Sequence, residues 1–176
     1  MVDTSLCYPA MPIPHARRMN LIALALLITA LIAFGAFHFL PMMSDTEFDR
    51  MGADPNEISA GWSIWQEIGN FLEAPDIDDP QMMIGISTFL TCVVLILACP
   101  FLIPLFRRSR LIWWVATIAS GLVLTGLGGL LVITNLERDE HPGPAIFSLL
   151  ASLALNFLGL LFIRRELPAA PEVDPA

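Results

Sequence analysis

The chain has 176 residues, of which 56% are hydrophobic and 15% are charged, and its mean hydropathy is +0.69. This composition excludes an ordinary soluble domain and indicates an integral membrane protein. The formal net charge of −8 and the absence of lysine leave little basic surface, so we expect no nucleic-acid partner.

Four segments contain no Asp, Glu, Lys or Arg, and each is long enough to cross a hydrocarbon core of about 30 Å as a helix. Helices are expected because lipid offers no hydrogen-bonding partner to backbone groups. The predicted fold class is therefore an all-α integral membrane protein with a four-transmembrane-helix bundle. The segments are residues 20–40, 82–106, 111–134 and 143–163. The first is also open to interpretation as a secretory signal, although its apolar run is longer than a signal core.

The arginines predict the orientation of the spans. Seven of the nine lie in the tail 1–19, the turn 107–110 and the tail 164–176. Thirteen of the seventeen acidic residues lie instead in the loops 41–81 and 135–142. By the positive-inside rule, this is a multi-pass protein of the cell membrane with cytoplasmic N and C termini.

Within the long extracytoplasmic loop, the sequence predicts an amphipathic helix over about residues 55–74. Asp54 suits the N-cap, Pro55 suits the first helical position, and Glu57 completes a capping-box pattern. Apolar residues then recur on one half of the helical wheel. We expect five of them to bind a partner, with the two tryptophans as anchors. They are Ile58, Trp62, Trp65, Ile68 and Leu72.

Three surfaces can bury this apolar face: the outer end of the protein's own bundle, the outer leaflet, or another protein. The polar face carries Glu67 and Glu73, whereas helices that lie on lipid usually carry Lys and Arg. Lipid alone is therefore the weakest alternative. A lid on the chain's own bundle and an interface with a partner both stay open.

One constellation in the sequence offers metal or catalytic chemistry. His38 ends the first span and His141 precedes the fourth, so both imidazoles are expected at the outer rim near Asp139 and Glu140. Histidine and carboxylate side chains are zinc ligands, but the spacing matches no metal-binding signature. We otherwise expect no cofactor.

Small and weakly polar residues recur every four positions in the last two spans, a pattern that suits close helix packing. They are Thr117, Gly121, Thr125 and Gly129 in the third span, and Ser148, Ser152 and Asn156 in the fourth. They are expected either to join the spans of one chain or to dock another membrane subunit. Pro100 and Pro104 are expected to kink the second span.

Ion-coupled transporters usually keep an ionisable residue deep in a span, and the four predicted spans carry no Asp, Glu, Lys or Arg. We therefore expect a non-enzymatic accessory or assembly subunit. It would contact membrane lipid and bind either a membrane-protein partner or a second copy of itself. The alternative is an outer-face metal or catalytic site near His38 and His141.

Overall fold

The computed structural model describes residues 15–42, 60–73, 80–138 and 142–163. These residues form six helices, four of which are long and apolar enough to cross a membrane: α1, α4, α6 and α7. For these residues, the prediction of an all-helical chain with four helices able to cross a membrane and a further helix in the first loop is confirmed. In chain order the helices are α1 (His15–Phe37), α3 (Ser63–Glu73), α4 (Pro80–Ala98), α5 (Ile103–Arg108), α6 (Arg110–Arg138) and α7 (Pro144–Phe162).

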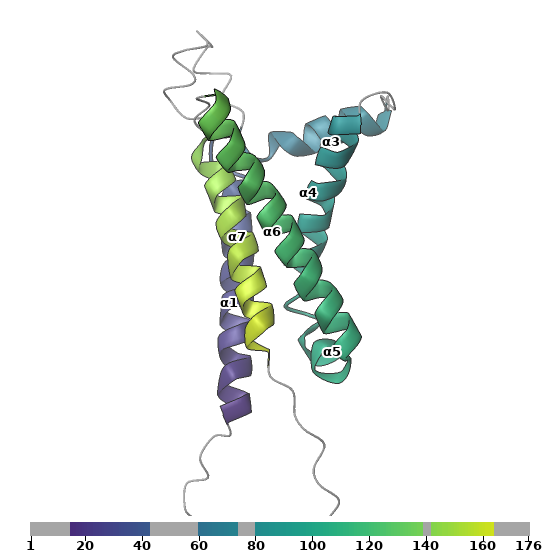
Figure 1. Ribbon diagram of the computed structural model, residues 1–176, viewed down its shortest axis with the longest axis vertical. Coiled ribbons are helices and arrows are strands. Elements are labelled where there is room, and N and C mark those ends of the chain that lie inside the picture. Colours follow the sequence, from purple (N-terminus) through teal and green to yellow (C-terminus); the bar gives the residue numbers. More distant parts are fainter. Residues whose placement is uncertain (1–14, 43–59, 74–79, 139–141, 164–176) are drawn as a thin grey trace, which may run out of the picture.

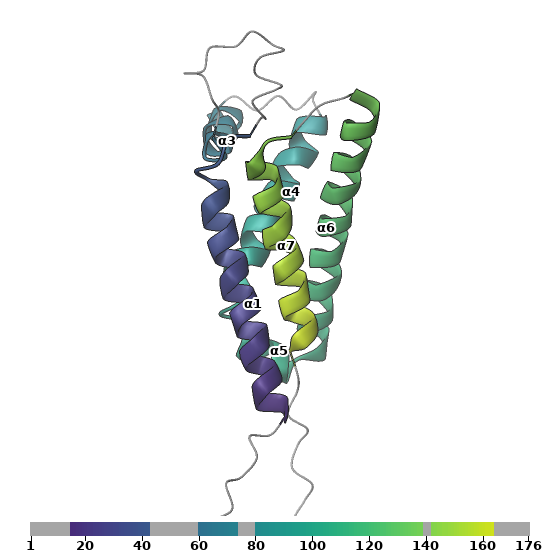
Figure 2. The ribbon, with the colours of Figure 1, turned by 90° about the vertical axis from the view of Figure 1, so that its left-hand side faces the viewer.

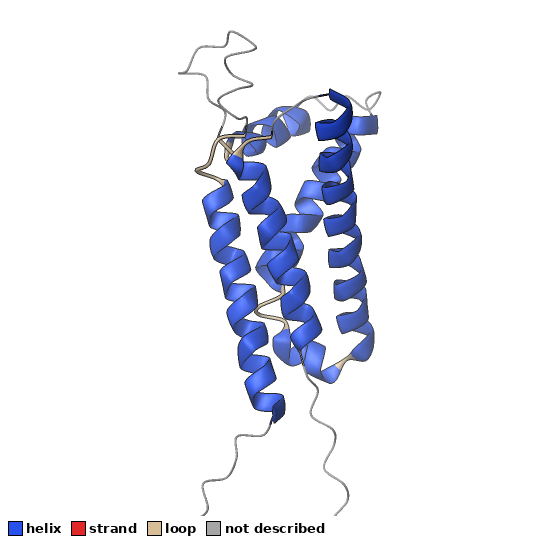
Figure 3. Cartoon of the chain, turned by 60° about the vertical axis from the view of Figure 1, so that its left-hand side comes forward, coloured by secondary structure: helices blue, strands red, loops and turns tan. Residues whose placement is uncertain are grey.

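The helices α1 and α7 lie side by side and form the most extensive contact between any two elements (Figures 1 and 2). Helix α6 packs on α7, and α4 touches α1, α6 and α7 over shorter stretches. Helix α1 begins and α7 ends at one end of the bundle, together with α5, which we call the terminal end (Figure 3). Helix α3 lies across the opposite end, which we call the loop end (Figure 1).

The second predicted span, 82–106, is divided in the structure. Helix α4 ends at Ala98, and the short α5 starts at Ile103. Pro100 has no N–H, so the helical hydrogen bond to the carbonyl of Ile96 cannot form. Pro104 falls in the first turn of α5, where a missing N–H costs nothing. The two prolines thus break this helix rather than merely bending it.

Residues 38–42 follow α1 and form a strap across the loop end. The Gly61 amide donates a hydrogen bond to the Leu40 carbonyl oxygen at 3.0 Å. The Trp62 amide donates to the His38 carbonyl oxygen at 3.1 Å. Carbonyl groups beyond the last helical turn need such partners, because no further helix supplies them. The strap therefore fixes the entry to α3.

The same strap also fixes the start of α7. The Gly143 amide donates to the carbonyl oxygen of Met42 at 2.8 Å, one of the contacts that join chain segments a hundred residues apart. The Ala145 amide donates to the carbonyl oxygen of Pro41 at 3.1 Å. These amides belong to the first turn of α7, where no helical carbonyl can accept from them. The end of α1 and both loops are thereby one hydrogen-bonded unit.

The loop helix is shorter than the predicted 55–74, since it begins only at Ser63. Ala60 pairs with Pro41 in an isolated antiparallel bridge, and residues 61–62 form a turn. The prediction that one continuous helix runs through residues 60–62 is wrong, because their backbone bonds the strap instead. The predicted capping residues Asp54, Pro55 and Glu57 lie outside the described residues.

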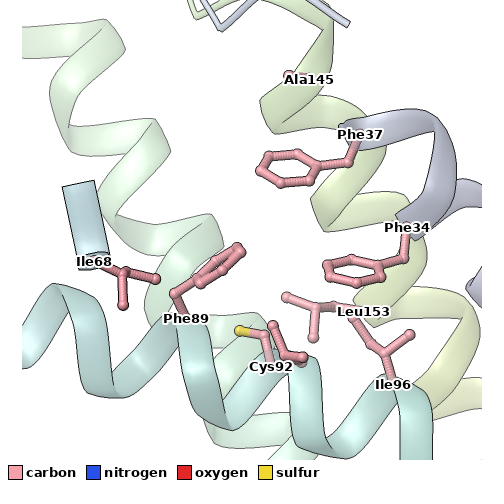
Figure 4. Packing of buried hydrophobic residues seen from close by; sticks show 9 residues of the cluster. Phe34, Phe37, Ile68, Phe89, Cys92, Ile96, Ala145 and Leu153 are labelled. Carbon is pink, nitrogen blue, oxygen red and sulfur yellow. The ribbon is translucent and has the colours of Figure 1, made fainter. Parts of the chain in front are cut away.

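Buried side chains form two clusters, one toward each end of the bundle. Figure 4 shows the loop-end cluster, in which Phe34 and Phe37 of α1 face α4 and α7. Its buried members are Phe34, Phe37, Ile68, Phe89, Cys92, Val93, Ile96, Ala145 and Leu153. The terminal-end cluster contains Ala23, Leu27, Cys99, Phe106, Leu160 and Ile163. The first cluster positions α3, and the second joins the broken second span to α1 and α7.

Candidate functional site

Helix α3 is held to its own bundle by Ile68 and Trp65. Ile68 is 6% exposed and belongs to the loop-end cluster (Figure 4). The Trp65 ring stacks on the imidazole of His38, with centroids 6.2 Å apart and planes 6° apart. It also meets the Phe89 ring edge to face, at 5.3 Å and 70°. One face of α3 therefore covers the ends of α1 and α4.

Two other predicted partner residues are largely exposed at the two ends of α3. Trp62 is 49% exposed and Leu72 is 72% exposed. Trp62 precedes the first residue of α3, so it does not share the helical wheel with Ile68. Ile58 lies outside the described residues. Of the four residues of this set that the structure describes, Ile68 is buried, Trp65 packs on His38 and Phe89 but is 38% exposed, and Trp62 and Leu72 are more exposed still.

His38 is half-buried at the loop end among aromatic rings. Its Nδ1 donates a hydrogen bond to the Phe34 carbonyl oxygen at 2.9 Å, and its ring meets Phe37 edge to face at 5.1 Å. His141 lies outside the described residues, so the pairing of His38 with His141 stays a prediction. Among the residues described, no group of three or more His, Cys, Asp and Glu side chains is placed to hold a metal ion.

The polar residues of α7 face three different helices. Ser148 Oγ donates to the Ala33 carbonyl oxygen at 2.8 Å, and Ser152 Oγ donates to that of Ala30 at 2.7 Å. Both acceptors are in α1. Each step of four residues turns about 40° further around a helix. The next member, Asn156, accordingly leaves α1 and faces α4 and α6.

The four-residue repeat of α6 turns around its helix in the same way. Its members are Thr117, Gly121, Thr125 and Gly129, which we call the α6 ladder. Thr117 is 4% exposed, and a Cβ on Gly121 would lie 3.2 Å from the ring of Phe157 in α7. Thr125 and Gly129 are exposed, because twelve residues carry the ladder about 120° around the helix. The first half of this ladder packs inside the chain, and the second half forms an uncovered surface.

Sequence reasoning missed a polar junction of α4, α6 and α7. Asn156 is fully buried, and its Nδ2 lies 3.3 Å from Ser120 Oγ and 3.8 Å from Cys99 Sγ. Ser120 lies outside the four-residue ladder. Its signal in the sequence is the three-residue spacing from Thr117, which places both on one helix face.

Trp113 is a second packing residue that sequence reasoning does not reveal. Its Nε1 donates a hydrogen bond to the Leu160 carbonyl oxygen at 2.8 Å. That carbonyl is in the last turn of α7, where it also accepts a hydrogen bond from the Ile163 amide at 3.3 Å. The indole group therefore joins α6 to the end of α7, while the neighbouring Trp114 ring is 44% exposed.

These features define a multi-pass helical membrane protein with a packed loop-end helix and a small polar junction inside the bundle. Comparison with protein-family models, curated proteins and solved structures finds no match to this chain. The function must therefore be argued from the residues themselves.

Proposed function

We propose that this chain is a non-enzymatic accessory or assembly subunit of the cell membrane, which holds a membrane-protein partner at its loop end. The observation that carries the proposal is the exposure of large apolar groups at both ends of a fixed helix. Ile68 and Trp65 hold α3 to the bundle, while Trp62 at its start is 49% exposed and Leu72 near its end is 72% exposed. Each such side chain gains about 1.5 to 3 kcal/mol when it is fully removed from water.

A rigid support favours the use of Trp62 as a binding residue. The Trp62 backbone is bonded to the strap, and the Ile68 side chain is anchored in the loop-end cluster. Aromatic anchors that are already ordered lose less conformational entropy on binding. Trp62 is therefore suited to be the central contact of an interface.

The second supporting surface is the uncovered part of α6. Only 11% of the most apolar stretch of α6 is buried inside the chain, compared with 33% of that of α7. On this helix Thr125, Gly126 and Gly129 are exposed, and a Cβ on either glycine would meet no atom within 4 Å. Small residues allow close approach of another helix within a membrane. Lipid covers whatever part of this surface the partner leaves free.

Site-specific photo-crosslinking in the native membrane tests the proposal. The photoreactive amino acid p-benzoyl-phenylalanine would replace Trp62 or Leu72, one at a time, with Ile68 as the matched buried position. We expect protein adducts of one discrete mass from positions 62 and 72. Position 68 should react only within the chain, because Ile68 is buried there.

The identity of the adduct decides the outcome. A protein that crosslinks at position 62 and is lost when Leu72→Ala is added supports a partner interface. Adducts with lipid alone at both positions would contradict the proposal, because the exposed side chains of Trp62 and Leu72 would then contact the leaflet rather than a protein.

A further inference from the structure

The Asn156 side chain occupies the point where α4, α6 and α7 meet. It is fully buried, and it lies well inside the apolar span Pro144–Phe162. Its Nδ2 donates to Ser120 Oγ at 3.3 Å and approaches Cys99 Sγ at 3.8 Å. Its Oδ1 is also buried, and no group of the described chain donates a hydrogen bond to it.

An unpaired amide oxygen is costly here because neither the apolar core nor lipid offers a donor. Reversing the carboxamide does not remove the problem. Oδ1 would then accept from the Ser120 hydroxyl and face the Cys99 thiol, but the two protons of Nδ2 would lack acceptors. The first orientation needs a donor and the second an acceptor, and a small group that both donates and accepts hydrogen bonds satisfies the amide in either one.

The end of α4, which directly precedes Cys99 in the chain, has backbone carbonyls that also lack helical donors. Because Pro100 has no N–H, the carbonyl of Ile96 receives no helical hydrogen bond. In a continuous helix the Phe101 amide would donate to the Leu97 carbonyl. It donates instead to the Ala98 carbonyl at 3.1 Å. These carbonyls lie in the last turn of α4, next to Cys99. Broken backbone at membrane depth is tolerated where protein or water supplies the missing partners.

We propose that the junction of Asn156, Ser120 and Cys99 binds a water molecule inside the membrane-spanning bundle. The water donates a hydrogen bond to Asn156 Oδ1. Water both donates and accepts, and it is small enough for a site enclosed by three helices. It links α7 to the point where α4 is interrupted. This site is independent of the partner interface at the loop end.

Solid-state NMR of the full chain in lipid bilayers tests this site directly. Asparagine and leucine would carry ¹⁵N, and polarisation would be transferred from water protons. The variant Asn156→Leu assigns the side-chain signal. We expect the Asn156 amide signal to grow several-fold faster than the backbone amide of Leu153, which is fully buried in the same helix. The growth should persist when the lipid is deuterated.

Two results would overturn the proposal. Growth at Asn156 no faster than at Leu153 would mean that no water contacts the amide. Growth that disappears in deuterated lipid would mean that the polarisation comes from lipid acyl protons, so that no water contacts the amide. The control variant Ser152→Ala should leave the Asn156 signal unchanged, because the Ser152 hydroxyl bonds Ala30 instead.

Discussion

Gly61 lies so close to Phe37 that a Cβ atom at position 61 would overlap the Phe37 carbonyl oxygen. This contact brings the entry of α3 against the end of α1. It also allows the Gly61 amide to reach the Leu40 carbonyl oxygen at 3.0 Å. The position therefore requires glycine because of the close approach.

The variant Gly61→Ala is expected to detach residues 60–62 from the strap. Overpacking and the loss of two backbone hydrogen bonds should lower the free energy of unfolding by about 2 to 4 kcal/mol. Denaturant titration in detergent micelles, followed by tryptophan fluorescence, measures the change in the free energy of unfolding. In the matched control Gly69→Ala, the new Cβ meets no atom within 4 Å, so stability should be unchanged or slightly raised. Equal stability of both variants would refute the role of this contact.

A second close approach joins α1 to α7 at Gly159. A Cβ there would lie 2.8 Å from Leu27 Cδ2 and 3.3 Å from the Ala23 carbonyl oxygen. We expect Gly159→Ala to lower the free energy of unfolding by about 1 to 3 kcal/mol, because Leu27 is fully buried and has little room to move. Gly128→Ala, where the added methyl meets open space, is the control. A neutral Gly159→Ala would show that α1 and α7 are not packed this closely.

The Ser152 hydroxyl should contribute to the same helix pair. Ser152→Ala removes its hydrogen bond to Ala30 and should lower stability by about 0.6 to 2 kcal/mol. Thr125→Ala is the matched comparison, because Thr125 is exposed and bonds the Gly121 carbonyl of its own helix at 2.8 Å. That variant should change stability by less than Ser152→Ala does. The reverse order would contradict the assignment of Ser152 to the α1–α7 contact.

Trp113→Phe tests the connection between α6 and the end of α7. The phenyl ring keeps most of the apolar contact but cannot donate to the Leu160 carbonyl oxygen. We expect a loss of about 0.5 to 1.5 kcal/mol in the free energy of unfolding. Trp114→Phe, at an exposed ring, should have a smaller effect. A larger loss of stability for Trp114→Phe than for Trp113→Phe would contradict the assignment of the α6–α7 hydrogen bond to Trp113.

The spans themselves were predictable because a run of about 20 residues without charge has few alternatives to a membrane helix. The entry to α3 was not, because the turn at Gly61 depends on Phe37 and the strap, which are distant in the sequence. The amphipathic pattern therefore predicted a helix through residues 60–62, where the structure has a bridge and a turn. Packing partners that lie far along the chain override local helix propensity in such cases.

The interior polar residues show the same limit. A four-residue ladder is visible in the sequence, but the helix that each member faces depends on its rotation around the axis. Thr117 and Gly129 consequently lie in different environments. Ser120 becomes important only because α7 brings Asn156 to it, and the break after Ala98 brings Cys99 there as well.

The most direct test of the account is the accessibility of two cysteines placed at opposite ends of the bundle. Asn70→Cys in α3 and Ser109→Cys between α5 and α6 would be made in a chain whose Cys7, Cys92 and Cys99 are replaced by alanine. In intact cells, a membrane-impermeant maleimide should label Asn70→Cys, and it should label Ser109→Cys only after permeabilisation. Labelling of both positions from the same side would contradict a four-span protein with α3 opposite its termini.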